Sequence, residues 1–211
     1  MDKNIKALVV VSLLTSCLYA GGDVAPIVIP EPEVNNSAFY LGLGVSSMSL
    51  RNDYSDEKFS ATAIMLQAGY QYNNYIAIEG RYTRNLGDLD YDHGNNLNVG
   101  NAIYDGDYPG DFSNIAIYLK PMYNFNSFSV YALLGYGEVS LTNIPHPSTL
   151  GSTDRAEAGF QWGLGASYEF TNNIGVFVDY VNMYDGKGFD LRAMDADITA
   201  DVWTLGVSYK F

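Results

Sequence analysis

The sequence predicts an all-β fold, an eight-stranded antiparallel transmembrane β-barrel with up-and-down connections, on the strength of three observations. From residue 38 to residue 211, apolar residues alternate with small or polar ones, the period of a strand whose two faces meet different surroundings. Short and long connections alternate between these segments, and aromatic residues gather near both ends of the segments. The three patterns are independent of one another, and together they predict strands that cross a membrane.

Composition excludes several classes of protein. The chain has 211 residues, with 24 Asp and Glu against 11 Lys and Arg, and a formal net charge of −13. A nucleic-acid-binding face needs clustered Lys and Arg to neutralise phosphates, so we expect no nucleic-acid partner. The single Cys excludes a disulfide framework and a zinc site built from cysteines. We expect no cofactor.

Residues 1–20 have the three parts of a secretory signal peptide. Lys3 and Lys6 form a basic start, residues 7–14 form an apolar run, and Ala20 supplies a small residue at the exit. The apolar run is shorter than the ~20 residues that a membrane-spanning helix needs. We therefore expect the chain to leave the cytoplasm and to be cleaved after Ala20.

Cys17 leaves a second kind of processing open. Residues 14–17 resemble a bacterial lipobox, in which the cysteine becomes the lipidated N-terminus of the mature protein. Residues 21–37 hold three prolines and are typical of a semi-extended linker, which we expect in the periplasm. In either case the barrel is expected over residues 38–211.

The expected strands each carry an apolar residue at every second position. A strand advances ~3.3 Å per residue, so about ten tilted residues cross an apolar band ~25 Å tall. Pro121 is a misfit because it lacks the N–H of a paired strand, and we expect a bulge or a wet rim there. The eight strands are expected at residues 39–46, 62–71, 76–83, 114–123, 130–137, 160–170, 174–180 and 203–211.

The connections predict how the barrel is oriented. Outer-membrane barrels have short turns on the periplasmic side and long loops on the outside of the cell. Tight turns are expected around residues 73–74, 126–127 and 171–173, and long loops at 51–59, 85–112, 141–158 and 183–200.

The second face of each strand is mostly Gly, Ser, Gln, Ala and Tyr, with one or two charges. A soluble β-sandwich also alternates, but its second face meets water and usually carries more charge. A Lys or Arg facing lipid at the midplane costs roughly 2–4 kcal/mol, so the charged face is expected to line the lumen. Glu169 and Lys210 have a second candidate place, at a rim that meets water. The expected lumen polar network is Gln67, Glu79, Arg81, Lys120, Gln161, Glu169 and Asp179.

The last strand resembles the C-terminal signal read by the bacterial outer-membrane barrel assembly machinery. Residues 40–44, 79–82 and 134–137 resemble the small eight-stranded barrel family around the OmpA transmembrane domain, OmpX and opacity proteins. This resemblance covers about residues 38–211. It implies a place in a Gram-negative outer membrane, contact with its lipid and lipopolysaccharide, and insertion by that machinery. The signal residues are Trp203, Leu205, Val207, Tyr209 and Phe211.

One expected loop carries alternating carboxylates that make Ca²⁺ binding an alternative to consider. Asp88, Asp90 and Asp92 are spaced as oxygen ligands could be. An EF-hand loop has Gly at its sixth position and Glu at its twelfth, which here, counted from Asp88, hold His93 and Val99. The motif fails, and a solvated acidic loop without a metal is the favoured interpretation.

His146 and Ser148 form a His-x-Ser pair that resembles the motif of lipid A deacylases, with Glu157 as a candidate to orient the histidine. The pair lies beside two prolines in an expected loop, so we expect no catalytic site. A small pore is the other alternative, although side chains fill the lumen of eight strands. The expected role is therefore non-enzymatic, either structural or adhesin-like, with a ligand outside the cell bound by the four long loops.

Overall fold

The computed structural model describes residues 37–52, 58–92, 105–145, 152–186 and 197–211. The chain divides into two units, residues 1–34 and 35–211, and every described residue belongs to the second. The expected signal peptide lies outside the described residues, as does the expected linker except for Ser37. Within the described ranges, no helix is long and apolar enough to cross a membrane.

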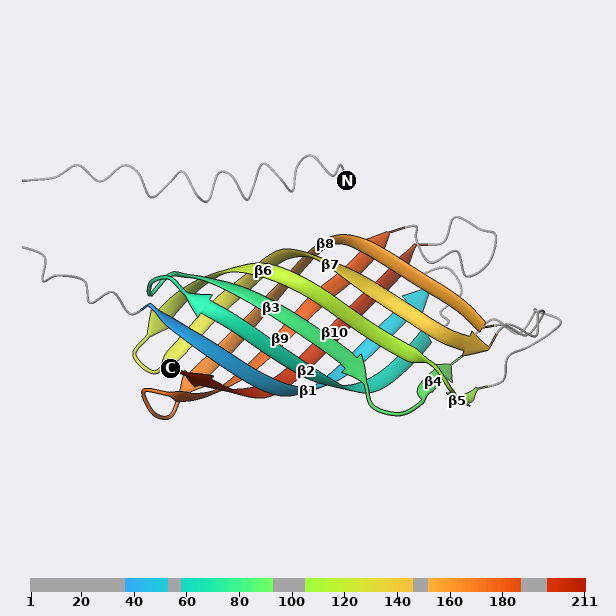
Figure 1. The fold of residues 1–211 in the computed structure, drawn as a ribbon, viewed down its shortest axis with the longest axis horizontal. Coiled ribbons are helices and arrows are strands. Elements are labelled where there is room, and N and C mark those ends of the chain that lie inside the picture. Colours follow the sequence, from blue (N-terminus) through green and yellow to red (C-terminus); the bar gives the residue numbers. More distant parts are fainter. Residues whose placement is uncertain (1–36, 53–57, 93–104, 146–151, 187–196) are drawn as a thin grey trace, which may run out of the picture. The chain divides into compact units, whose positions relative to one another are not determined.

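Eight of the strands close into an antiparallel barrel, in the order β1, β2, β3, β6, β7, β8, β9, β10 and back to β1 (Figure 1). All eight expected strands are confirmed, and each is longer than or similar to its expected range. The strands are β1 (Ala38–Asn52), β2 (Lys58–Gln71), β3 (Ile76–Asn85), β4 (Leu89–Asp92), β5 (Gly106–Tyr108), β6 (Asp111–Phe125), β7 (Phe128–Pro145), β8 (Ser152–Glu169), β9 (Ile174–Gly186) and β10 (Ile198–Lys210).

Three tight turns lie at one end of the barrel, which we call the turn end; the opposite end is the loop end. At the first turn, the Asn73 side-chain oxygen accepts hydrogen bonds from the backbone N–H groups of Tyr75 and Ile76. At the second, Asn126 has a φ of 55°, a conformation that Asn tolerates better than most residues. These contacts explain why asparagines mark the turns in the sequence.

Two short strands, β4 and β5, extend the sheet at the loop end. β4 pairs with residues 58–60 of β2, above the point where β3 leaves that strand, and β5 pairs with β4. The Asn85 side chain fastens this branch point: its amide donates to the carbonyls of Gly87 and Gly110 and accepts from the N–H of Phe112. The expected 85–112 loop is therefore partly sheet.

β7 and β8 also continue well beyond the expected strand ends. Their pairing runs to Pro145 opposite Ser152, with a register shift between Leu141 and Ile144. Much of the expected 141–158 loop is thus a hairpin. The sequence prediction ended these strands too early because the apolar residues change faces there.

The polarity of the two faces reverses along the strands. On β1, Leu41 and Leu43 point outward and are about half exposed, whereas Ser46, Met48 and Leu50 point inward and are buried. Beyond Val45, the outward positions of β1 are Ser47, Ser49 and Arg51. β2 and β10 reverse in the same way. An apolar outside suits hydrocarbon and a polar outside suits water, so the reversal marks where each strand leaves the membrane.

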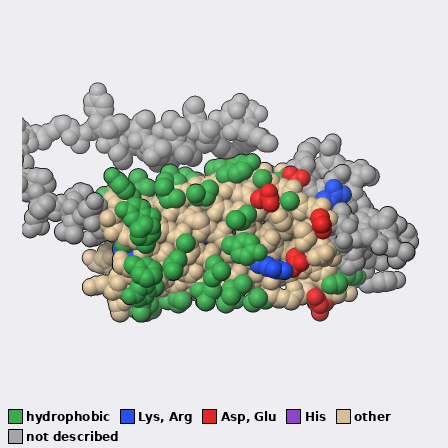
Figure 2. Space-filling view, viewed as in Figure 1, with side chains coloured by type: hydrophobic (Ala, Val, Ile, Leu, Met, Phe, Trp, Pro, Cys, Tyr) green, Lys and Arg blue, Asp and Glu red, His purple; other side chains and the backbone are tan. Residues whose placement is uncertain are grey.

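Between this reversal and the loop end, apolar side chains fill the inside of the barrel. Figure 2 shows the matching outside: hydrophobic side chains cover the turn end and the middle, and charged ones lie toward β4 and β5. The buried loop-end cluster contains Met48, Leu50, Phe59, Leu89, Phe112, Val139, Leu141, Val181, Met183, Ile198 and Val202.

Pro121 lies in β6 near the turn end. β6 pairs with β7 at Leu119 opposite Leu134 and again, in the same register, at Met122 opposite Tyr131. Lys120 and Pro121 are skipped in that ladder, and Pro121 pairs with Ile76 on the other side. The missing N–H therefore interrupts one ladder locally without a shift of register.

Candidate functional site: a closed lumen and an acidic rim

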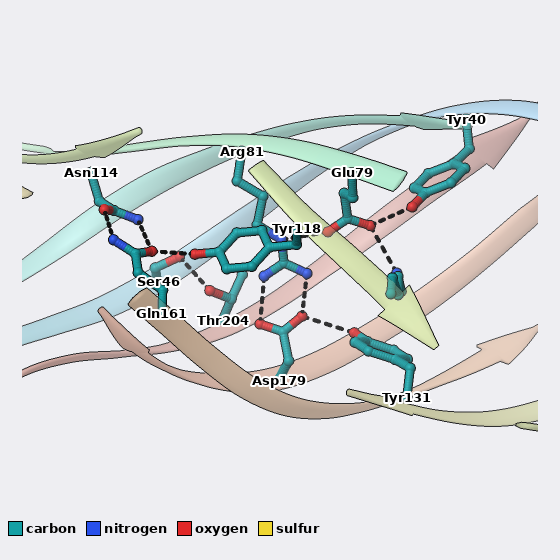
Figure 3. Close-up of polar contacts among 11 residues, drawn as sticks. Tyr40, Ser46, Glu79, Arg81, Asn114, Tyr118, Tyr131, Gln161, Asp179 and Thr204 are labelled. Atoms are coloured by element: carbon teal, nitrogen blue, oxygen red, sulfur yellow. Dashed lines mark hydrogen bonds and ion pairs between the residues drawn. The ribbon is translucent and has the colours of Figure 1, made fainter. Parts of the chain in front are cut away.

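Four charged side chains meet in the middle of the lumen. Arg81 on β3 donates to both carboxylate oxygens of Asp179 on β9, at 2.9 and 2.7 Å, and its Nε also contacts Glu79. Lys120 on β6 donates to the other oxygen of Glu79 at 2.8 Å. Two cations and two anions balance, which is what buried charges require to remain ionised away from water (Figure 3).

Tyrosine hydroxyls complete the coordination of these carboxylates. Tyr40 donates to Glu79 at 2.6 Å and Tyr131 donates to Asp179 at 2.8 Å. The ammonium of Lys120 lies 4.0 Å from the centre of the Tyr131 ring, a cation–π distance. The four charges and two tyrosines form one connected group, the ion-pair layer, in which Glu79 is 0 % exposed and Asp179 1 %.

An amide layer lies next to the ion-pair layer, toward the loop end. Gln161 on β8 and Asn114 on β6 exchange hydrogen bonds, and the Tyr118 hydroxyl donates to Gln161. Gln161 is fully buried and Tyr118 is 1 % exposed. These side chains and the loop-end cluster fill successive cross-sections of the lumen, as expected for eight strands.

Five of the seven residues expected in the lumen network are brought together in these two layers: Glu79, Arg81, Lys120, Gln161 and Asp179. Gln67 is buried in the lumen but forms no hydrogen bond through its side-chain oxygen. Glu169 is exposed at the turn end, and Lys210 there is half-buried, so the structure places both at the wet rim.

Sequence reasoning missed Tyr40 and Asn114 as members of the network. Both occupy inward positions of predicted strands, and their place in the alternation of inward and outward residues is the sequence signal that identifies them. Their partners could not be read from the sequence, because Tyr40 and Glu79 are 39 residues apart and Asn114 and Gln161 are 47 apart.

The alternative catalytic and metal sites are placed as follows. His146 and Ser148 lie outside the described residues, and Glu157 lies on β8. Asp90 and Asp92 are exposed on β4, with Asp88 exposed just before it. Within the described part of the chain, no group of three or more His, Cys, Asp or Glu side chains is placed to hold a metal ion.

Carboxylates dominate the described part of the loop end, which we call the acidic rim and define as residues 51–52, 58–60, 84–92, 105–112, 138–145, 152–158, 183–186 and 197–202. These described segments contain 12 Asp and Glu and 4 Lys and Arg. The barrel residues between them contain three of each sign. Among the described residues, the net charge of the barrel thus lies entirely at its rim.

One ion pair of the rim joins three strands. Arg84 on β3 donates to Asp111 on β6 at 2.6 Å, and Asn143 on β7 donates to the other carboxylate oxygen of Asp111. The hydrogen bond from Arg84, then that from Asn143, lowers the pKa of Asp111, and the same pair raises the pKa of Arg84. Both groups are largely exposed, so water and salt screen the interaction.

The expected assembly-signal residues lie on the outward face of β10 and at the chain terminus. Trp203, Leu205 and Val207 are each more than half exposed, and Phe211 donates its N–H to the carbonyl of Phe39 at 2.9 Å. Trp203 also stacks with Tyr180, which in turn contacts Trp162. These rings form part of the aromatic belt where the strands leave the membrane.

Comparisons with known proteins agree with this architecture. Ail, the attachment invasion locus protein of Yersinia pestis, solved with the heparin analogue sucrose octasulfate, is 19% identical over 83% of this chain and 99% of its own, with a TM-score of 0.55. Neisserial surface protein A is 13% identical over 82% and 97%, with a TM-score of 0.58. OprG from Pseudomonas aeruginosa is 16% identical over 83% and 96%, with a TM-score of 0.51. At these identities the likeness shows the fold.

No curated protein sequence matches the chain. The family model of the outer membrane protein beta-barrel domain matches residues 19–211, which is most of the chain. The chain therefore belongs to the outer-membrane β-barrel family, and it is a protein of the bacterial outer membrane.

Proposed function

We propose that this barrel has no enzymatic role and acts as a structural or surface-interaction protein, with the acidic rim as the part that meets partners outside the cell. The closed lumen is the observation that carries the proposal. Glu79, Asp179 and Gln161 are each 0–1 % exposed within the ion-pair and amide layers, and the loop-end cluster lies above them. The polar surface available to a partner is then the part of the strands beyond the membrane.

The charge of the rim limits the chemistry of that partner. Ail was solved with the heparin analogue sucrose octasulfate, but the described rim here has 12 acidic against 4 basic residues. Like charges repel and slow encounter, most strongly at low salt. We therefore propose a neutral or cationic partner. Retention of the detergent-solubilised protein on a heparin column at low salt would contradict this part of the proposal.

Contact with lipopolysaccharide and recognition by the barrel assembly machinery belong to the same proposal. The exposed outward face of β10 supports the second, since Trp203, Leu205 and Val207 form an alternating apolar stripe that runs from the loop-end aromatic belt toward the turn end. Val207→Asp would place a charge on that stripe, and slower insertion of the variant into outer-membrane vesicles is expected.

An exchange of residues 93–104 for a Gly/Ser linker of equal length tests the surface role. A Gram-negative strain that expresses the chain would be applied to immobilised protein and glycan arrays. We expect binding by the unmodified chain, loss of binding by the exchange variant, and no change for Asn172→Ser, which alters a short turn at the opposite end.

Two results would defeat the proposal in favour of another function. Discrete conductance steps of the purified protein in planar bilayers would establish a pore. A lipid A mass spectrum that loses an acyl chain when the protein is expressed, and regains it with His146→Ala, would establish an enzyme. If neither occurs and the array binding is unchanged by the exchange, the adhesin-like role is wrong and a structural role remains.

A further inference from the structure

At the turn end, the lumen opens into a cavity of about 280 Å³. Its closed end is formed by members of the ion-pair layer: Tyr40, Lys120 and Tyr131 all line it. Figure 3 shows the two tyrosine rings reaching from opposite sides toward Glu79 and Asp179. A solute that enters from the turn end therefore meets a closed floor and cannot pass through the barrel.

A buried amide whose oxygen lacks a hydrogen-bond donor lines this cavity. Gln67 is 4 % exposed, and its Oε1 has no donor among the described residues. Its side chain lies over Gly42, where a Cβ would be only 2.6 Å from Nε2. The glycine thus gives the amide room, and the amide remains as a buried acceptor that a ligand or a water must satisfy.

The walls add hydroxyl groups and aromatic surface. Ser167 and Ser208 line the cavity, are half-buried, and form no side-chain hydrogen bond with any described residue. Phe177, 4 % exposed, contributes its ring. Gly175 lies between Ser208 and Glu169, since a Cβ there would lie 3.4 Å from Ser208 Oγ and 3.7 Å from Glu169 Cγ.

Charge around the cavity is balanced. Glu169 and Lys210 line its mouth, one of each sign, and no ion pair within 4 Å joins either of them to a described residue. Lys120 on the floor is already paired with Glu79. The cavity therefore has no excess charge to hold an ion, but it offers both donors and acceptors beside aromatic rings.

We propose that this cavity binds one neutral sugar unit from the periplasmic side. A sugar ring carries hydroxyls that both donate and accept, and its C–H faces pack against aromatic rings. The volume is slightly below the roughly 300–1,000 Å³ of sites for drug-sized ligands, which suits a single ring. An acetamido sugar fits best, because its N–H can donate to Gln67 Oε1. This site is separate from the acidic rim at the other end of the barrel.

Titration with N-acetylglucosamine tests the proposal, with the ¹⁵N-labelled protein in nanodiscs and amide chemical shifts as the readout. We expect saturable shifts, with a dissociation constant in the millimolar range, for the Gln67 side-chain amide and the backbone amides of Gly175 and Ser208. Gln67→Leu is expected to weaken binding at least tenfold. Ser46→Ala is the control, because Ser46 lies beyond the ion-pair layer and bonds to Thr204.

Several outcomes would overturn the proposal. Shifts that rise linearly without saturation, or that spread over the whole barrel, show no site. Equal or tighter binding of inorganic phosphate would show recognition by Lys120 and Lys210 instead of a neutral sugar. If Gln67→Leu does not show the heat-modifiable gel migration of a folded barrel, Ser208→Val is used in its place for the binding measurement. Unchanged affinity in the folded variant would refute the site.

Discussion

Arg81 and Asp179, 98 residues apart in the chain, form a two-point ion pair across the diameter of the barrel, with N–O distances of 2.9 and 2.7 Å. β3 and β9 are separated by three strands in either direction around the closed sheet, so the pair joins opposite walls. A shift of β3 by one residue would turn Arg81 and Glu79 outward into lipid. The pair therefore fixes register as well as filling the lumen.

Arg81→Leu is expected to destabilise the barrel strongly, because it leaves two buried carboxylates with a single cation. Removal of one partner of a buried pair costs about 3–5 kcal/mol. Lys120→Met should cost less, since Glu79 keeps Arg81 and Tyr40 as partners. Urea unfolding in lipid vesicles measures both. Equal, small effects would mean that water reaches the layer.

Leu43→Arg and Ser47→Arg test where β1 leaves the membrane. Both side chains are exposed on the outward face, but Leu43 pairs with Leu66 and Val207, whereas Ser47 lies beyond the reversal of polarity. We expect Leu43→Arg to cost about 2–4 kcal/mol and Ser47→Arg about 0–1 kcal/mol. The same unfolding measurement compares them, and a larger cost at Ser47 would place the membrane boundary higher on the strand.

Leu50→Ala should loosen the loop end without opening the turn end. Leu50 is 1 % exposed within the loop-end cluster, and a buried Leu→Ala change costs about 2–5 kcal/mol. Hydrogen exchange is expected to rise in the loop-end halves of β1, which carries Leu50, and of its neighbours β2 and β10. Exchange in the ion-pair layer at Glu79 and Arg81 should stay slow; a uniform rise would show that the two halves unfold together.

Two glycines are expected to differ in how much a substitution by alanine destabilises the barrel. At Gly135 a Cβ would lie 2.1 Å from the backbone oxygen of Ile117, which cannot move without disturbing the β6–β7 ladder. At Gly80, on the outward face, the nearest atom would be 3.8 Å away. Gly135→Ala should therefore cost about 1–3 kcal/mol as overpacking, and Gly80→Ala almost nothing. The shift in the heat-modifiability midpoint on gels measures the difference.

Asp111 gives the rim a weak dependence on acid. Arg84 and Asn143 hold its pKa below the unperturbed 3.8, so the carboxylate stabilises the folded rim at pH values above 3.8. That contribution is lost as the pH falls through the lowered folded value. Carboxyl ¹³C NMR of Asp111 should show a midpoint below 3.8 that returns toward it in high salt or in Arg84→Gln. Glu138→Gln is the control that should leave the midpoint unchanged.

The alternation of residues was enough to predict the strands, because a strand has only two faces and each face meets one medium. Positions such as Leu41, Leu43 and Leu66 had to face lipid once Glu79 and Arg81 could not. The alternation alone, which assigns every second residue of a strand to the inner face, was enough to predict that Lys120, Gln161 and Asp179 point into the lumen. The eight-strand closure followed from the count of segments, since an open edge in lipid would leave backbone groups unpaired.

Only the tertiary structure decided which inward-facing side chains contact one another and where the strands end. Which carboxylate pairs with Arg81 depends on the stagger of strands that lie opposite one another in the closed sheet. That stagger places Asp179 beside Arg81, whereas Glu169 lies at the rim. The extension of β7 and β8, and the added strands β4 and β5, were missed because the apolar face turns inward once a strand enters water. The level at which the hydrocarbon ends cannot be read from the sequence alone. It is shown by the burial of Met48, Leu50 and Phe112 inside the loop end of the barrel.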